Sequence, residues 1–145
     1  METRINISKV DPKAYEAMIG LEKYLMQSGL DKTLYELIKT RASQINGCAY
    51  CLNMHTRDAM ELGETPQRLF LLDAWRETKL FTDKERAVLA LTESMTLLSN
   101  GQVTDDIYKN AETHLTPNEL AAVIMAVVAI NGWNRIAITT RTLLD

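Results

Sequence analysis

The amino-acid sequence predicts an all-α fold in a single domain that covers residues 1–145. Signals for the start and end of helices divide the chain into segments of helical length. Apolar residues recur in these segments with the spacing of one helical face. No stretch of useful length alternates apolar and polar residues as a strand does, and the chain has no internal repeat or low-complexity tract. A length of 145 residues is also typical of one compact domain.

Three helices are expected in the first half of the chain. They run from Asp11-Pro12 to Ser28-Gly29, from Asp31 to Asn46-Gly47, and from about Cys48 to Leu62, before Gly63. Aspartate is a favoured N-cap, proline suits the first helical position, and glycine commonly ends a helix. Asn46 is expected to cap the third helix, which would place Cys48 in its first turn.

Four more helices are expected in the second half. They begin at Thr65-Pro66, Thr82, Thr104 and Thr116-Pro117. The first is short and continues through Leu72, and the second ends at Asn100-Gly101. Both Thr82 and Thr116 are followed three residues later by glutamate, the pattern of a reciprocal capping box. These two helix starts are therefore specified locally.

The last helix is the most apolar part of the chain. From Leu120 to Ile130 it is apolar on all sides, which indicates central burial or coverage by a partner subunit. Self-association is therefore expected. The same run is too short to cross a bilayer, and the first thirteen residues lack the apolar core of a signal peptide, so we expect a cytoplasmic protein without a membrane partner.

The composition excludes some classes of function. With 46% hydrophobic and 24% charged residues, the chain resembles an ordinary soluble globular protein rather than a disordered one. Its sixteen basic and nineteen acidic residues give a net charge of −3, and neither sign forms a long block. Nucleic acid is therefore not an expected partner.

The two cysteines of the chain form one motif, Cys48-Ala-Tyr-Cys51, and His55 follows it. A cytosolic pair at this spacing is usually redox-active or metal-binding, because the reducing compartment disfavours a permanent disulfide. Near a helix start, backbone N–H groups and the helix dipole stabilise a thiolate. Cys51 is close enough in sequence to form a disulfide with Cys48, and His55 is on the same helical face as Cys51, where it could accept a thiol proton.

Glu36 is a further candidate. It falls on the polar side of its helix with Lys39, Thr40 and Ser43, a pattern typical of solvated residues. However, Glu36 precedes the turn after Asn46 by about as many residues as separate that turn from His55. In two antiparallel helices the two side chains would therefore lie at similar heights and could share a site.

Other interpretations of these residues remain open. The cysteines could be two buried thiols, or they could join His55 in a zinc site whose fourth ligand would be His114 or a carboxylate. By its position, His114 is expected to be a surface residue or a partner for the C-terminal dipole of its helix. Trp75 and Trp133 are expected to be buried anchors rather than platforms for a ligand.

The stretch from Glu36 to Gly63, ELIKTRASQINGCAYCLNMHTRDAMELG, resembles the core motif of the AhpD-like alkylhydroperoxidases in the carboxymuconolactone decarboxylase superfamily. The segment Phe81–Ala87 is also similar to one found in many members. The resemblance implies an all-α fold, a homotrimer or homohexamer, and a dithiol peroxidase. Such an enzyme takes electrons from a disulfide relay.

The resemblance also implies roles for individual residues. Cys51 matches the cysteine that is oxidised to a sulfenic acid, Cys48 matches its partner in disulfide formation, and Glu36 and His55 match the proton-relay positions. One position departs from the family: Tyr50 stands where the best-known members have a histidine. The relay is therefore expected to lack one imidazole.

The expected function is reduction of a hydroperoxide by the Cys48–Cys51 dithiol, without a metal or a tightly bound cofactor. An external dithiol, lipoyl-type or thioredoxin-like, would act as the reductant. Two alternatives remain: a decarboxylase-like enzyme acting on a small organic acid, and a non-enzymatic, oligomeric redox sensor. The segment Asn131–Arg135 is a candidate pocket lining without an assigned role.

Overall fold

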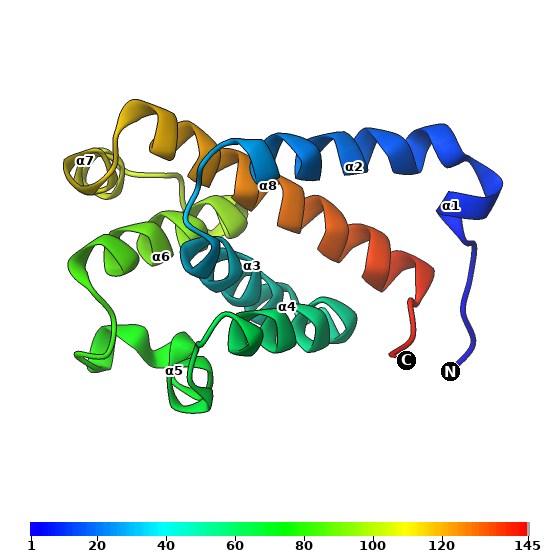
Figure 1. The fold of residues 1–145 in the computed structure, drawn as a ribbon, viewed down its shortest axis with the longest axis horizontal. Coiled ribbons are helices and arrows are strands. Elements are labelled where there is room, and N and C mark those ends of the chain that lie inside the picture. Colours follow the sequence, from blue (N-terminus) through cyan, green and yellow to red (C-terminus); the bar gives the residue numbers. More distant parts are fainter. Residues whose placement is uncertain (145) are drawn as a thin grey trace.

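The computed structural model describes residues 1–144, which form helices and connecting loops and contain no strand. Figure 1 shows the long helix α8 running diagonally through the molecule, with α2 on one side and α3 and α4 on the other. The α-helices are α1 (Ile7–Val10), α2 (Pro12–Gln27), α3 (Lys32–Asn46), α4 (Ala49–Glu61), α5 (Pro66–Phe70), α6 (Asp83–Thr96), α7 (Asp105–His114) and α8 (Pro117–Thr140). Two 3₁₀ helices, Leu72–Glu77 and Leu98–Asn100, follow α5 and α6. The all-α prediction is confirmed.

Most helix starts have the capping chemistry that the sequence predicts. The side chains of Asp11 and Asp31 accept hydrogen bonds from the first turns of α2 and α3. Thr82 and Thr116 both form complete capping boxes with the glutamate three residues later. Each of these side chains satisfies a backbone N–H that has no partner within its helix.

Four details differ from the prediction. The short helix α1 was not expected, and the helix after Thr65 ends at Phe70 before a 3₁₀ helix. Helix α6 ends at Thr96, also before a 3₁₀ helix. The predicted cap of α4 is wrong, because Asn46 is the last residue of α3 and Cys48 caps α4. Gly47 ends α3 in the left-handed region, with φ of 68°, and Cys48 then adopts the extended backbone of an N-cap.

Helix α8 is the central element of the domain. It contacts α2, α3, α4, α6 and α7, and the side chains of Val123, Val127 and Ile130 are buried among them. Burial within the same chain therefore accounts for most of the apolar run from Leu120 to Ile130, although Val128 remains exposed. By length and composition α8 could cross a membrane, but a core helix of a soluble protein passes the same test.

Helix α2 packs closely against α8 near the C-terminal half of that helix. A Cβ atom on Gly132 would lie 2.9 Å from Cε of Met18, so the absence of a side chain there permits the close contact. At the end of α8, the backbone N–H of Arg4 donates to the carbonyl of Thr140 at 2.9 Å. The N-terminal segment is therefore fastened beside the C-terminal end of α8, where Figure 1 also shows the two termini.

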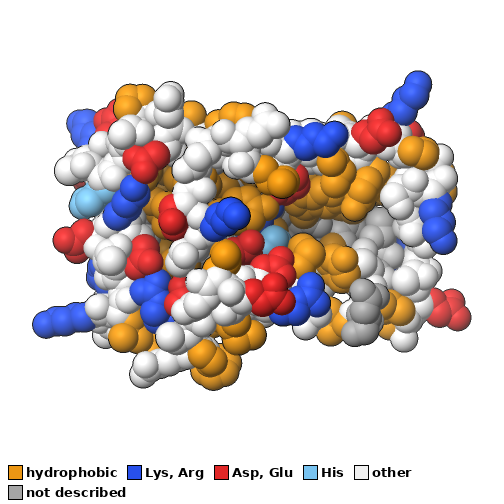
Figure 2. Space-filling view, viewed as in Figure 1, with side chains coloured by type: hydrophobic (Ala, Val, Ile, Leu, Met, Phe, Trp, Pro, Cys, Tyr) orange, Lys and Arg blue, Asp and Glu red, His pale blue; other side chains and the backbone are white. Residues whose placement is uncertain are grey.

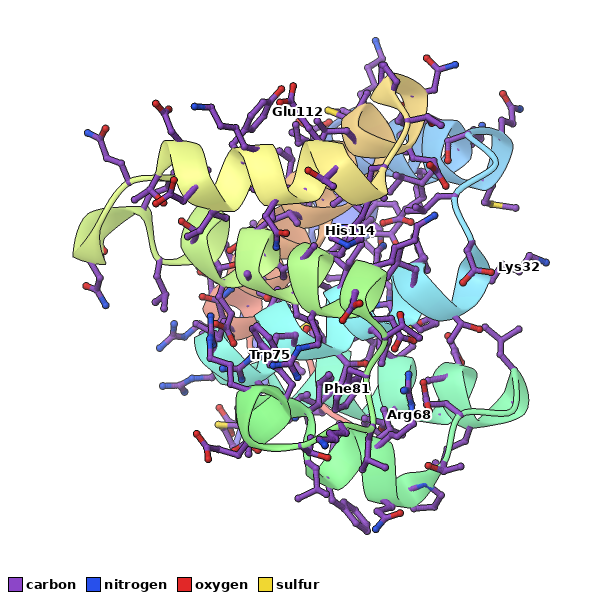
Figure 3. All side chains as sticks on the ribbon, turned by 90° about the vertical axis from the view of Figure 1, so that its left-hand side faces the viewer. Lys32, Arg68, Trp75, Phe81, Glu112 and His114 are labelled. Carbon is purple, nitrogen blue, oxygen red and sulfur yellow. A yellow bond between two sulfur atoms is a disulfide. The ribbon has the colours of Figure 1, made fainter. Side chains whose placement is uncertain are left out.

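A second cluster of contacts joins α5, the 3₁₀ helix after it and α6. The Arg68 guanidinium lies 4.5 Å from the centre of the Phe81 ring and forms ion pairs with Glu64 and Glu85, and Figure 3 shows Arg68 and Phe81 side by side. Trp75 is buried, as predicted, and its indole N–H donates to Glu93 at 2.8 Å. These contacts hold α5, the 3₁₀ helix after it and α6 together.

Glu93 is the acceptor at the centre of this cluster. Its carboxylate also forms ion pairs with Arg41 of α3 and with Arg76. Burial by itself would raise the pKa of the Glu93 carboxyl, but the hydrogen bonds from Arg76, Trp75 and Arg41 hold it below its ordinary value. The ionised carboxylate therefore stabilises the fold at neutral pH.

Candidate redox site

Cys48 and Cys51 form a disulfide at the junction of α3 and α4, with their Cα atoms 5.4 Å apart. Cys48 is the N-cap of α4, and its Sγ accepts a hydrogen bond from the backbone N–H of Cys51 at 3.3 Å. Both sulfur atoms thus lie at the positive end of the helix dipole, which favours a thiolate when the pair is reduced. The helix start required by the redox interpretation is present, although Cys48 lies two positions earlier in the helix than predicted, at the N-cap instead of in the first turn.

A cavity of about 370 Å³ adjoins the disulfide. Of the two cysteines it is Cys51 that lines this cavity, together with His55 and Glu36. Its remaining lining residues are Tyr15, Ile19, Glu22, Tyr35, Lys39, Tyr50, Met54, Asp58, Trp133, Ile136, Ala137 and Thr142. Figure 2 shows hydrophobic side chains gathered in the middle of one face, where the surface is hollowed. The cavity thus combines one cysteine in its wall with mostly apolar surroundings.

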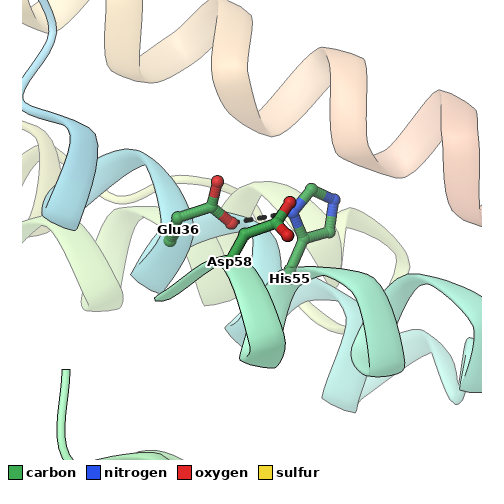
Figure 4. Close-up of side chains that lie close together, drawn as sticks. All are labelled: Glu36, His55 and Asp58. Carbon is green, nitrogen blue, oxygen red and sulfur yellow. Dashed lines mark hydrogen bonds and ion pairs between the residues drawn. The ribbon is translucent and has the colours of Figure 1, made fainter. Parts of the chain in front are cut away.

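Glu36 and His55 meet across the α3–α4 interface. Nδ1 of His55 lies 2.8 Å from Oε2 of Glu36, and both side chains are buried (Figure 4). A carboxylate has no N–H to donate, so an ionised Glu36 pairs with His55 by accepting a hydrogen bond from Nδ1–H, which leaves Nε2 free of this contact. The arrangement supplies an oriented base beside a nucleophile.

The polar side of α3 is not solvated, contrary to the pattern of its own helix. Glu36, Lys39, Thr40 and Ser43 are all buried, because α4, α6 and α8 pack against α3 and Glu22 of α2 bonds to its side chains. A helix whose polar residues are covered by neighbours needs partners for those residues. Helices α2, α4 and α8 supply partners for Lys39, Glu36 and Ser43. The hydroxyl of Thr40 has no hydrogen-bond partner among the described residues.

Helix α2 supplies Glu22, which forms a buried ion pair with Lys39. The same carboxylate accepts a hydrogen bond from the Tyr35 hydroxyl at 2.5 Å and one from the Trp133 indole at 2.9 Å. Burial would raise the pKa of the Glu22 carboxyl, but the charge of Lys39 and these hydrogen bonds hold it below its ordinary value. Burial, followed by the hydrogen bond and charge of Glu22, raises the pKa of the Tyr35 phenol.

Helix α8 supplies the segment Asn131–Arg135, whose role the sequence did not reveal. The amide nitrogen of Asn46 donates to Oδ1 of Asn131 at 3.0 Å and to Oδ1 of Asn134 at 2.9 Å. Asn134 in turn donates to the hydroxyl of Ser43 at 2.9 Å. These bonds fix the end of α3, and with it the Cys48 turn, against α8. Asn46 therefore anchors the site instead of capping α4.

Trp133 also differs from its predicted role. It is half-buried and lines the cavity, with its ring edge-on to that of Tyr15 at 5.4 Å between centroids. The sequence offered no signal for this position, because the facing residues Tyr15 and Glu22 belong to a helix more than a hundred residues away. Tyr50, in the position of the missing histidine, is half-buried and also lines the cavity.

The zinc set considered from the sequence is not assembled among residues 1–144. The cysteines are joined to each other, and Nδ1 of His114, at the end of α7 (Figure 3), pairs with the Asn110 carbonyl of its own helix at 2.9 Å. A different group, Glu36, His55 and Asp58, brings three potential ligand atoms within 4.8 Å of one another (Figure 4). Asp58 is the member of this group that the sequence analysis missed; it lies three residues after His55 on the same face of α4.

Comparison with known proteins agrees with this site. The model of the carboxymuconolactone decarboxylase family matches residues 12–94, which include the dithiol, Glu36 and His55. The uncharacterized protein YdfG of Bacillus subtilis is 39% identical over 138 residues, which cover 95% of this chain and 94% of YdfG. The alkyl hydroperoxide reductase AhpD of Corynebacterium aurimucosum is 37% identical over 46 residues, 32% of this chain and 26% of that protein.

A solved structure also superposes on nearly the whole chain. It is a protein of unknown function from Agrobacterium tumefaciens, 38% identical, with a TM-score of 0.95 and coverage of 99% of both chains. The two proteins therefore share the fold of the whole domain and not only the motif around the cysteines.

Proposed function

This chain belongs to the carboxymuconolactone decarboxylase family and is AhpD-like, and we propose that it is a thiol-dependent peroxidase that reduces hydroperoxides through the Cys48–Cys51 dithiol. The observation that carries the proposal is the position of Cys51. Both cysteines are buried and bonded to each other, but Cys51 lines a cavity with His55, which Glu36 orients, whereas Cys48 does not line it. This divides the pair into an attacking and a resolving cysteine.

The proposed cycle begins with the reduced dithiol. His55, held by Glu36, takes the proton of the Cys51 thiol, and the thiolate attacks the terminal oxygen of the hydroperoxide. The O–O bond breaks, Cys51 becomes a sulfenic acid, and the alcohol leaves. The Cys48 thiol then displaces water from the sulfenic acid to form the disulfide, which an external dithiol of the lipoyl or thioredoxin type reduces.

The alternatives use the site less completely. A decarboxylase-like reaction on a small organic acid would leave the dithiol without a role. A redox sensor would use the dithiol but would not need repeated turnover. Alkylation by iodoacetamide with and without peroxide distinguishes dithiol chemistry from the decarboxylase alternative. Only dithiol chemistry converts the cysteines to a disulfide on addition of peroxide and so protects them from alkylation.

Steady-state turnover is the decisive test of the peroxidase. Purified protein should consume cumene hydroperoxide in the presence of dihydrolipoamide. One dihydrolipoamide should be oxidised to its disulfide for each peroxide consumed. Cys51→Ser protein is the matched control, because it keeps the cavity and removes the nucleophile. A wild-type protein that oxidises once and does not turn over with lipoyl or thioredoxin-type reductants would instead be a sensor.

We propose in addition that the protein is cytoplasmic and assembles as a homotrimer or homohexamer. The exposed apolar side chains Val128, Leu97 and Leu98 on neighbouring segments support assembly. Light scattering at micromolar concentration should give three or six times the mass of 16.4 kDa. A strictly monomeric mass would contradict the assembly but not the peroxidase.

A further inference from the structure

Lys39 is a charged residue of the cavity that the proposed cycle does not use. It lies one turn after Glu36 on α3, its side chain is 1% exposed, and it lines the cavity beside Cys51 and His55. Among the described lining residues it is the one lysine or arginine. A lysine this deeply buried is rare unless it is paired or has a function.

The surroundings of Lys39 hold its ammonium in place without using all of its donors. Its hydrogen-bond acceptor within residues 1–144 is Glu22, and Nζ lies 4.4 Å from the centre of the Tyr35 ring. An ammonium group has three N–H donors. One acceptor and one aromatic face therefore leave donor capacity on a group that borders the cavity.

Glu22 behaves as a fixed support for this ammonium. Besides Lys39 it binds Tyr35, also on α3, and Trp133 on α8. Three hydrogen bonds therefore fix the carboxylate in place. A purely structural ion pair between α2 and α3 would not need to border the nucleophile's cavity. The geometry instead resembles a preorganised donor aimed at a site where negative charge develops.

The proposed reaction develops such a charge. When the Cys51 thiolate attacks the terminal oxygen, the O–O bond breaks and the second oxygen leaves with the electron pair as an alkoxide. An alkoxide is a poor leaving group unless it is protonated or hydrogen-bonded as it forms. His55 has just taken the thiol proton at the attacking end, so a different group must serve the leaving oxygen.

We infer that Lys39 is a catalytic residue that donates a proton to the leaving oxygen of an organic hydroperoxide; this inference rests on the proposed function. The S–O bond forms as the O–O bond breaks, and Cys51 is oxidised by two electrons. The terminal oxygen of the peroxide becomes the oxygen of the sulfenic acid, and the other oxygen leaves in the alcohol. Lys39 becomes a neutral amine. The proton that His55 took from Cys51 then returns to Lys39, so that dithiol and hydroperoxide yield disulfide, alcohol and water with no net change in protons.

The electrostatics of the group agree with this role. Burial lowers the pKa of the Lys39 amine below its ordinary value, while the charges of Glu22 and Glu36 partly offset the effect. An amine so shifted is a stronger acid than a surface lysine. The carboxylates that face it keep it in the charged form that can donate.

The test compares peroxides that differ in their leaving group. Alkyl hydroperoxides release an alkoxide, which needs a proton, whereas peracetic acid releases acetate, which does not at neutral pH. Lys39→Met by itself leaves the buried Glu22 carboxylate without its cation and can unfold the protein. The double variant Lys39→Met/Glu22→Gln removes both charges, and circular dichroism with the melting temperature checks its fold.

The variant should lose about 10²-fold or more in kcat/KM for cumene hydroperoxide, the range of a lost general acid, and about threefold or less for peracetic acid. The alkylation rate of reduced Cys51 by iodoacetamide should be close to that of the wild type. An equal loss for both peroxides, or a matching fall in alkylation, would overturn the inference, because Lys39 would then support the fold or the thiolate. A wild-type protein that reduces neither peroxide overturns the proposed function itself, and the inference with it.

Discussion

Replacing Glu36 by glutamine tests whether Glu36 and His55 work as one unit. Glu36 is buried and accepts the Nδ1–H of His55 at 2.8 Å, a charge-assisted hydrogen bond in a site with little solvent. The amide of glutamine is nearly the same size but can donate to Nδ1. The imidazole proton would then move to Nε2, and the nitrogen proposed to act as the base would be blocked.

The magnitude follows from this loss. A positioned general base contributes about 10²- to 10⁴-fold, and a wrong imidazole tautomer in the serine protease triad removes about 10⁴-fold. We therefore expect Glu36→Gln to slow oxidation of Cys51 by about 10²- to 10⁴-fold. His55→Ala should slow it by about 10²-fold or more.

Single-turnover oxidation measures the step directly. Reduced protein is mixed with peroxide, quenched with iodoacetamide, and the disulfide is counted by mass spectrometry. Because the two residues act together, the double variant Glu36→Gln/His55→Ala should be no slower than the slower single variant. Asp58→Asn is the matched control, since this carboxylate is in the same group but has no hydrogen bond to His55 among the described residues.

Two results would refute the reasoning. If Glu36→Gln oxidises at the wild-type rate while folded, the buried carboxylate only supports packing. If the effects of the two single variants multiply in the double variant, Glu36 and His55 act independently and the shared hydrogen bond is not their mode of action.

Three further predictions concern the cysteines, Tyr50 and Glu93. Cys51→Ser should abolish turnover, whereas Cys48→Ser should stop after one attack with Cys51 as a sulfenic acid, which dimedone labels. Labelling of Cys51→Ser instead would reverse the assigned roles, and labelling of neither variant would remove them. Tyr50→His should raise turnover, because an imidazole titrates near neutral pH and a phenol does not, and an unchanged or lower rate would show that the relay needs no second imidazole. Glu93→Gln should destabilise the protein by about 1–3 kcal/mol at pH 7 in urea unfolding, because it replaces the charged acceptor of Trp75 and two arginines. The pKa of Glu93 is depressed in the folded state, so its stabilisation is present above the unfolded value and is lost as the pH falls; the difference between wild type and variant should shrink in acid, and a difference that grows would contradict the sign.

Much of the fold follows from short-range sequence signals. The capping boxes at Thr82 and Thr116 involve residues only three positions apart, so the sequence contains all of the groups that make them. The periodicity of α3 and the glycine at its end likewise predict its length. The start of α4 was predicted less well, because whether Asn46 or Cys48 caps it depends on the backbone angles on either side of Gly47.

Part of the candidate site also follows from residues that are close together in the sequence. The dithiol and His55 lie within two turns of one helix, so their proximity is a matter of helical geometry. The pairing of Glu36 with His55 could also be anticipated, because a short turn joins their two antiparallel helices.

Burial of the polar side of α3 was decided only by the tertiary structure. Lys39 and Glu36 have the local pattern of a solvated face, and nothing within their own helix shows that neighbours cover it. Glu22, which holds Lys39, comes from α2, and Trp133, which binds Glu22, lies 111 residues further along the chain. Caps and periodicity are set by groups a few residues apart. The polar wall of the cavity forms only when α2 and α8 pack against α3, and no pattern within any one of these helices predicts that packing.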